Sequence, residues 1–467
     1  MARYATPDLR QAQLPLDDTW IDRTLRVQRV WHEARKYPEP ILTADRPWER
    51  YCPVAFGTVL RRQGRFQMWY CAWTRHIPPR ACYAESDDGV TWSKPRLGLN
   101  DTLGSTDNNV VMVSQAADGV IDDLTVIDDP DDSRWPLKML YWDSAGDSRG
   151  KRGHGICAAR SKDGIAWESL GMVLPNWGDR FNALPVKHAG RYVVFGRAPG
   201  AGFSRGRTVY RTESRDLKRW TAPKLVMAAD VEDPPAMEIY SLPTFCHEGL
   251  IIGGIERMHM SPDVLDTEIA WSRDAGATWR RSRVRPSFIA RGAAGRFDSA
   301  WVNLTASQPI EQTNELWFYY SGRSAAHACP APHNHGAIGL ATLRRDGFCS
   351  IRAEAQPGEV LTTPLRWPGG DLLVNADCRR DITSHPHNFV TGELRVEARD
   401  VDGAPVTGYA AGECGALSIN TIRHDGAYVP VRWAGDRSMN KLAGRTIRLA
   451  FQLRDAHLYG FRAGAAT

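Results

Sequence analysis

A short motif with the pattern Ser-x-Asp-x-Gly-x-Thr-Trp recurs along the chain, and it restricts the possible folds more than any other feature. Its copies are YAESDDGVTW (83–92), AARSKDGIAW (158–167), YRTESRDLKRW (210–220), the complete IAWSRDAGATW (269–279) and the degenerate IGLATLRRDGF (338–348). Serine and aspartate side chains bond to nearby backbone groups and glycine accepts positive φ, so each copy predicts a tight turn. The tryptophan is expected to pack between sheets. We therefore expect structural roles for the aspartates of the motif, Asp88, Asp163, Asp216 and Asp274.

Two strand-like segments and a short apolar strand come before each copy of the motif, and a further strand-like segment follows it. The repeating unit is therefore three strands, the Asp-turn and a fourth strand, found about five times at intervals of roughly 50 to 75 residues. Four-stranded units at this spacing are typical of β-propellers. We predict an all-β chain with a five-bladed β-propeller over residues 45–365. The alternative is an array of β-sandwiches whose turns resemble one another by chance.

The pattern changes after residue 365. Alternating strands joined by Asp-Gly turns continue without the tryptophan motif, and DLLVNADC is expected to open this region. Such a pattern predicts a separate C-terminal β-sandwich over residues 366–467. Residues 1–44 are expected to form an N-terminal segment that packs on the domains.

Charge and composition limit the partners of this chain. Lys plus Arg is 59 and Asp plus Glu is 54, so the formal net charge is only +5, and no dense basic run appears. We therefore expect no nucleic acid partner. No apolar stretch approaches the roughly 18 to 20 residues needed to span a bilayer, so we expect no membrane partner. The start of the chain lacks a leader pattern and the nine cysteines stand singly, which predicts a reduced, cytoplasmic protein.

Acidic residues recur where the innermost strand of each predicted blade begins. In a four-stranded antiparallel blade, this end lies opposite the Asp-turn, and the five innermost strands converge around the axis. The three acids that we predict to be catalytic are Asp179, Glu238 and Asp298. Carboxylates gathered at one opening repel one another, so we expect perturbed pKa values there. The alternative for each acid is a structural role, as a strand cap or an arginine partner.

Arginines and histidines are expected at the same end of the blades. They either neutralise the acids or bind an anionic group, such as the carboxylate of a uronate. The residues that we predict to bind substrate are Glu49, Arg75, His76, Asp107, Asn108, His154, Arg180, Asn182, Arg197, Tyr240, Arg257, Arg323, His333 and His335.

Two segments contain residue types that can ligate a metal ion. CPAPHNH (329–335) matches no standard zinc spacing and favours a polar loop. VIDDPDD (126–132) favours a turn on the opposite face of the blades. The sequence therefore predicts no metal and no cofactor, and it does not determine an oligomeric state.

Some of these motifs resemble known families. SRDAGATW (272–279) resembles the Asp-box of sialidases and related propellers. YAESDDGVTWSKPRLGL followed by STDNNVV is similar to bacterial glycosidase-like proteins that are distantly related to invertases and arabinanases, and the final VPVRWAG and LAGRTIRLAFQLRDAHLYGF segments resemble the sandwich end of that group. The resemblance implies a five-bladed propeller, a C-terminal sandwich and glycosidase activity. The catalytic motifs of invertases do not occur here in order, so the site residues are predicted from their blade positions alone.

The pattern of acids predicts a glycoside hydrolase. Cleavage needs one carboxyl group as acid and a second as base or nucleophile; we assign Glu238 as acid, Asp179 as base or nucleophile, and Asp298 as a stabiliser. One alternative is a uronate-directed lyase, with His76, His154 or His333 and Tyr240 supplying the base. The other alternative is a propeller that binds carbohydrate without catalysis.

Overall fold

A computed structural model describes residues 7–49, 52–73, 77–116, 119–144, 153–200, 206–327, 329, 335–378, 392–418 and 428–465. In these segments the chain forms β-strands and short 3-10 turns at η1 (Pro47–Glu49), η3 (Ala411–Glu413) and η4 (Met439–Leu442), and no α-helix. The prediction of an all-β chain is confirmed. Within the same segments, no helix has the length and apolar character required to cross a membrane.

The chain divides into two compact units. The ring unit comprises Glu33–Ile310 and Trp317–Thr342, and the double-sheet unit comprises Met1–His32, Glu311–Leu316 and Leu343–Thr467. This division differs from the predicted boundary between residues 365 and 366. The reason is that β25 (Cys349–Ala353) and β26 (Gly358–Thr362) pair with strands near the C-terminus. The predicted N-terminal segment is likewise shared between the two units.

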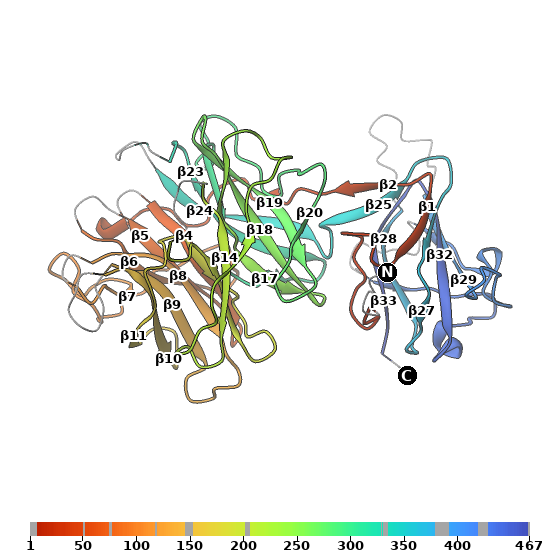
Figure 1. Cartoon of the computed structure of the whole chain (residues 1–467), viewed down its shortest axis with the longest axis horizontal. Helices are drawn as coiled ribbons and strands as arrows, with labels where there is room; N and C mark the ends of the chain where they lie inside the picture. The colour runs from red at the N-terminus through yellow and green to blue at the C-terminus, as the bar shows by residue number, and fades with distance from the viewer. Residues whose placement is uncertain are drawn as a thin grey trace. The chain divides into compact units, whose positions relative to one another are not determined.

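Three sheets of the ring unit are four-stranded antiparallel meanders (Figure 1). The first consists of β4 (Cys52–Arg62), β5 (Arg65–Trp73), β6 (Arg80–Ser86) and β7 (Val110–Met112). The second consists of β8 (Ile121–Asp128), β9 (Leu137–Asp143), β10 (Gly155–Ser161) and β11 (Glu168–Pro175). The third consists of β12 (Phe181–Ala183), β13 (Tyr192–Gly196), β14 (Val209–Ser214) and β15 (Lys224–Met227).

The remaining strands of the ring unit form two further groups, joined by a parallel pair between Leu265 and Trp301. The fourth group consists of β16 (Met237–Ser241), β17 (Thr244–His247), β18 (Leu250–His259), β19 (Val264–Ser272) and β20 (Arg280–Arg281). The fifth consists of β21 (Trp301–Leu304), β22 (Ile310–Glu311), β23 (Glu315–Arg323), β24 (Gly336–Arg344) and β3 (Arg35–Lys36). Because β3 pairs with β24, a strand from near the N-terminus completes the group formed by the last repeat.

Four copies of the recurring motif form the turn between the third and fourth strands of a group, whereas the degenerate fifth copy (338–348) leads from β24 into β25 of the double-sheet unit. In the first copy, Oδ1 of Asp88 accepts hydrogen bonds from the backbone N–H groups of Val90 (2.8 Å) and Thr91 (2.7 Å). The Ser86 hydroxyl accepts one from the N–H of Gly89 (2.8 Å), whose φ of 77° is in the left-handed region. Asp163, Asp216 and Asp274 make the same kind of bond to backbone N–H groups.

The tryptophans of the motif link neighbouring groups of strands. Trp167 of the second sheet contacts Trp69 of the first, and Trp279 of the fourth group contacts Phe195 of the third. Trp92 of the first sheet contacts Tyr319 of the fifth group, with ring centroids 5.9 Å apart. A shared apolar core joins the second and third sheets. Together with the parallel pair between β19 and β21, these contacts link each group of strands to the next and the fifth group back to the first.

The double-sheet unit consists of two antiparallel sheets (Figure 1). One contains β1 (Ile21–Leu25), β26, β27 (Leu365–Arg366), β29 (Glu393–Arg399), β30 (Leu417–Ser418) and β32 (Thr446–Arg454). The other contains β2 (Gln28–Trp31), β25, β28 (Leu372–Asp377), β31 (Val429–Pro430) and β33 (Ala456–Ala463). Side chains from both sheets bury one apolar core around Trp20, Phe451 and Phe461.

Candidate functional site

The second sheet begins at a different place from the one predicted. The segment at Asp107 and Asn108, expected to open an innermost strand, instead leads into β7, the fourth strand of the first sheet. Asp107 is exposed and pairs with Arg96 (3.1 Å), and the Asn108 amide donates to the backbone oxygens of Asn100 and Ser105. Both residues therefore stabilise a loop. The first strand of the second sheet is β8, which begins with Ile121, Asp122 and Asp123.

Arg180 connects three groups of strands at the end of the ring opposite the Asp-turns. Its guanidinium donates to Oδ2 of Asp123 (2.8 Å) and to both carboxylate oxygens of Glu256 (3.2 and 2.6 Å). All three side chains are buried, and the guanidinium lies 4.0 Å from the ring centroid of Phe56. Glu256 is on β18, the strand next to β16, so the first, second and fourth groups all meet at this arginine. Arg180 was predicted to bind substrate, but its donors are occupied by carboxylates.

Asp122 is an acid with a strongly displaced pKa at this end of the ring. Burial raises the pKa of Asp122 to about 8, the charges of Asp179 and Asp123 add to the increase, and Arg323 opposes it. Among the described residues, no group hydrogen-bonds to Oδ1 of Asp122. Burial also raises the pKa of Asp123 to about 7 against the effect of Arg180. Asp122 is therefore protonated at neutral pH and has a proton to donate.

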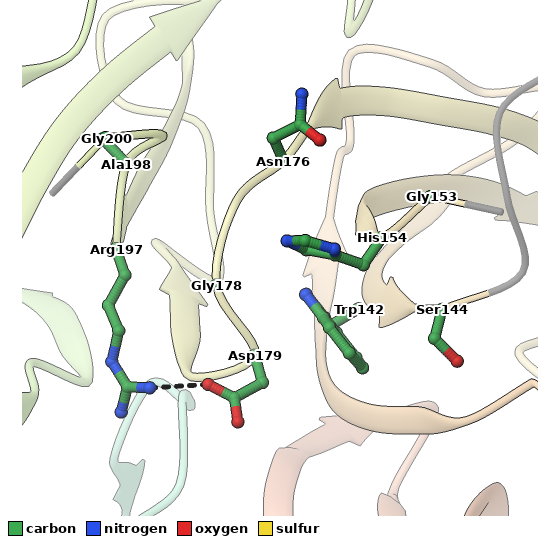
Figure 2. Close-up of a pocket in the computed structure, with 10 residues that line it drawn as sticks. All are labelled: Trp142, Ser144, Gly153, His154, Asn176, Gly178, Asp179, Arg197, Ala198 and Gly200. Atoms are coloured by element: carbon green, nitrogen blue, oxygen red, sulfur yellow. Dashed lines mark hydrogen bonds and ion pairs between the residues drawn. The ribbon is translucent and has the colours of Figure 1, made fainter. Parts of the chain in front are cut away.

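A pocket of about 550 Å³ opens between the second and third sheets. Asp179 and Arg197 form one wall, joined by an ion pair of 2.6 Å, and Trp142 and His154 lie across from them (Figure 2). The Asp179 side chain is 46% exposed, so it is accessible to a ligand. Three predicted site residues thus line one pocket, and its volume is that of a small-molecule site.

An aromatic cluster adjoins Arg197. Tyr240 packs edge-on against Trp301 (5.2 Å between centroids), and the imidazole of His327 stacks on Trp301 (4.8 Å, 6° between planes). The guanidinium of Arg197 lies 5.2 Å from the Tyr240 ring centroid and that of Arg207 lies 5.5 Å from it. This cluster thus carries positive charge beside the pocket.

Glu238, the predicted acid, lies next to this cluster at the start of the fourth group. Its Oε2 pairs with Nη1 of Arg207 at 2.5 Å, and its side chain is mostly buried. The ion pair ties Glu238 to an arginine that also contacts Tyr240. Glu238 does not line the pocket that contains Asp179.

Four other predicted site residues are enclosed by the protein. Asp298 is 2% exposed and accepts hydrogen bonds from Lys36 (2.8 Å) and Tyr320 (3.0 Å). Glu49 is buried and accepts from Lys94 (2.7 Å) and Tyr70, and the Asn182 amide donates to Ser241. Arg257 binds both oxygens of Asp266 (2.9 and 2.8 Å). Each of these side chains is held by a partner within the protein, so a structural role fits each of them.

Four predicted site residues remain. Arg75, His76 and His333 lie outside the described residues. His335 is exposed, and its backbone oxygen accepts from the N–H of Ser324 (3.1 Å). All nine cysteines are free thiols.

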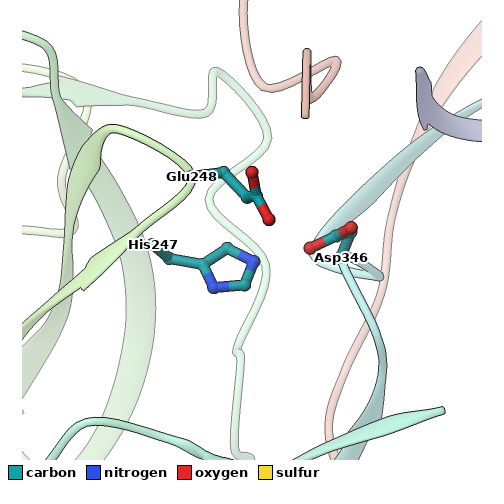
Figure 3. Close-up of side chains that lie close together, drawn as sticks. All are labelled: His247, Glu248 and Asp346. Carbon is teal, nitrogen blue, oxygen red and sulfur yellow. The ribbon is translucent and has the colours of Figure 1, made fainter. Parts of the chain in front are cut away.

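Another titratable pair stands on the turn between β17 and β18. His247 is buried and Glu248 is partly exposed, and both side chains point to the same side of this turn (Figure 3). Asp346, which Figure 3 also labels, belongs to the double-sheet unit, and we assign the three residues no common site.

Sequence reasoning missed Asp122, Asp123 and Glu256. The signal for the first two was present in VIDDLTVIDD, where two acids open an apolar strand. To identify this segment as the first strand of the second sheet, one must first assign NNVVMV as the fourth strand of the first sheet. The sequence of NNVVMV does not indicate that position. Glu256 lies within an apolar strand, and no local sequence pattern indicates that its side chain is buried against Arg180.

Comparison with known proteins gives similar structures and no sequence relatives. No family model matches the chain, and no curated protein matches it. Solved structures that resemble it include an N-acetylgalactosamine deacetylase from F. plautii (14% identity, 69% of this chain and 96% of that chain, TM-score 0.47). Others are a β-1,2-mannobiose phosphorylase from Listeria innocua (12%, 67% and 97%, 0.49) and a thermostable family-43 glycoside hydrolase (16%, 68% and 96%, 0.45). At these similarities, the chemistry of this chain has to be derived from its own residues.

Proposed function

We propose that the ring unit is a glycoside hydrolase that uses Asp122 and Asp179 as its pair of carboxyl groups. The observation that carries this proposal is the difference between the two acids. Asp122 has a pKa of about 8, whereas Asp179 forms an ion pair with Arg197 at the wall of an open pocket. Two interacting carboxyl groups whose environments separate their protonation states are suited to acid and base roles in one reaction.

In the proposed reaction, Asp122 donates its proton to the glycosidic oxygen as the bond to the anomeric carbon breaks. The ionised Asp179 either removes a proton from the attacking water or attacks the anomeric carbon itself, and water then releases the sugar. This assignment replaces Glu238 with Asp122 as the acid, because Glu238 pairs with Arg207. It also omits Asp298, because Lys36 and Tyr320 enclose that carboxylate.

The test is hydrolysis of a panel of chromogenic glycosides by the wild-type chain and by Asp122→Asn and Asp179→Asn. We expect each substitution to lower kcat/KM about 10²- to 10⁴-fold, since an amide neither donates nor accepts the required proton. Asp107→Asn is the matched control, because Asp107 is exposed and pairs with Arg96 in a loop. Full activity in both site variants would overturn the assignment, and binding of sugars without turnover by the wild type would support a non-catalytic propeller.

A uronate-directed lyase is the second candidate, favoured by the arginines beside the pocket. Elimination requires a group that neutralises the carboxylate and a base that removes the α-proton. His154 lines the pocket and is a candidate base. Burial raises the pKa of Tyr240 to about 12, which makes this phenol a weak candidate at neutral pH. Ultraviolet absorbance of an unsaturated product distinguishes elimination from hydrolysis.

A further inference from the structure

Arg323 is a buried cation whose charge lowers the pKa of Asp122, but it makes no ion pair of 4 Å or less with any described carboxylate. It ends β23 and is 4% exposed. Its guanidinium lies among three aromatic rings, 4.6 Å from the centroid of Trp301, 5.0 Å from Trp73 and 5.8 Å from Phe56. No described group accepts a hydrogen bond from its Nε.

Arg197 has unused donors as well. Its Nη1 binds Asp179, whereas its buried Nε and Nη2 have no acceptor among the described residues. Arg197 contacts the ring of Tyr240, which packs on Trp301, and Trp301 contacts Arg323. The two guanidinium groups therefore border the same aromatic cluster beside Asp179.

Other buried arginines of the ring unit show what is missing at Arg323. Arg180 binds Asp123 and Glu256, Arg257 binds Asp266, and Arg281 binds Asp233 and Glu268. Removing a charge from water is costly unless an opposite charge or hydrogen bonds compensate for it. Aromatic faces compensate only in part. Arg323 thus retains the capacity to bind an anion that enters the site.

We propose that Arg323 and Arg197 bind the carboxylate of an acidic sugar, so that the substrate of the ring unit is a uronic acid glycoside. This inference rests on the proposed hydrolase function and names its substrate class. A guanidinium matches a planar carboxylate with two parallel hydrogen bonds. The partly exposed ring of Trp73 adds the apolar surface that a sugar site needs and a free inorganic anion does not.

The test compares glycosides that differ only at C6: 4-nitrophenyl glucuronides against glucosides, and galacturonides against galactosides. We expect the wild-type chain to prefer the uronide of a pair. Arg323→Met should lower kcat/KM for the uronide roughly 10- to 100-fold more than that for the neutral glycoside of the same pair. Arg197→Met also removes the ion-pair partner of Asp179, so it should lower both values, with the larger loss for the uronide. Arg323→Lys keeps the positive charge but lacks the two parallel N–H donors of a guanidinium, so it should show a smaller loss of kcat/KM for the uronide than Arg323→Met. Arg96→Met is the matched control, because the Arg96 side chain is 83% exposed and pairs with Asp107 in a loop.

Preference for the neutral glycoside in each pair would overturn the inference and leave the proposed hydrolase intact. Failure to hydrolyse any glycoside would overturn the proposed function, and calorimetric titration then decides the inference alone. Binding of glucuronate or galacturonate that exceeds binding of glucose or galactose, and that Arg323→Met abolishes, would support it. Binding of inorganic phosphate with no binding of either acid sugar would contradict it. Melting temperatures of the variants show whether each one is folded.

Discussion

The two ends of the ring unit use aspartates in opposite ways. At the turn end, backbone N–H groups of Thr91 and Val90 hold the pKa of exposed Asp88 at about 2. At the other end, burial and neighbouring acids raise the pKa of Asp122 to about 8. The same side chain is thus a permanent anion in one place and a proton donor in the other.

This difference shows that hydrogen-bond donors and burial decide what a carboxyl group can do. Donors from a tight turn stabilise the charged form and fix the backbone, so Asp88 contributes to the fold. Removal from water without donors destabilises the charged form, so Asp122 is suited to chemistry. Between these cases stands Asp123, which is buried but accepts bonds from Arg180 and from the N–H of Phe181.

Removing the counter-charge from the buried end should have the largest effect. Arg180→Met leaves Asp123 and Glu256 buried without their shared partner, and we expect the free energy of unfolding to fall by about 3 to 5 kcal/mol. Chemical denaturation measures this change, with Arg96→Met as the exposed control. A loss below about 1 kcal/mol would mean that these carboxyl groups do not need the arginine to remain buried.

The pH dependence of activity tests the raised pKa of Asp122 directly. Because the acid form of Asp122 is the proton donor, kcat/KM should be constant just below pH 8 and fall about tenfold per unit above it. In Asp122→Asn, the residual activity should lack this alkaline limb. An alkaline limb that persists in the variant would assign the titration to another group.

A substitution at the turn end should have the smallest effect on stability, and this effect should depend on acid pH rather than alkaline pH. Asp88→Ala removes two acceptor contacts at an exposed turn, and we expect it to lower the free energy of unfolding by roughly 1 kcal/mol without changing kcat. Since the folded pKa lies below the ordinary value of about 3.9, this contribution is present above pH 4 and is lost as the pH falls towards 2. Denaturation of wild type and variant at pH 7 and pH 2.5 measures the difference, which should shrink at the lower pH. An equal loss at both pH values would contradict the turn role.

The sequence by itself determined the features that depend on neighbouring residues. Ser86, Asp88 and Gly89 specify a turn wherever the strands lie, because their hydrogen bonds close within a few residues. The repetition of this turn and of the strand pattern was enough to predict an all-β chain built from repeated antiparallel groups of strands. It was also enough to place Asp179 and Arg197 at the end of the ring opposite the turns.

Only the tertiary structure decided which acids are accessible and which are enclosed. Asp298 and Glu49 look like site residues in sequence, yet Lys36 and Lys94 arrive from other segments and neutralise them. The raised pKa of Asp122 and the aromatic surroundings of Arg323 both come from residues on separate strands. Burial and charge pairing depend on contacts between distant parts of the chain, and a local pattern carries no information about them.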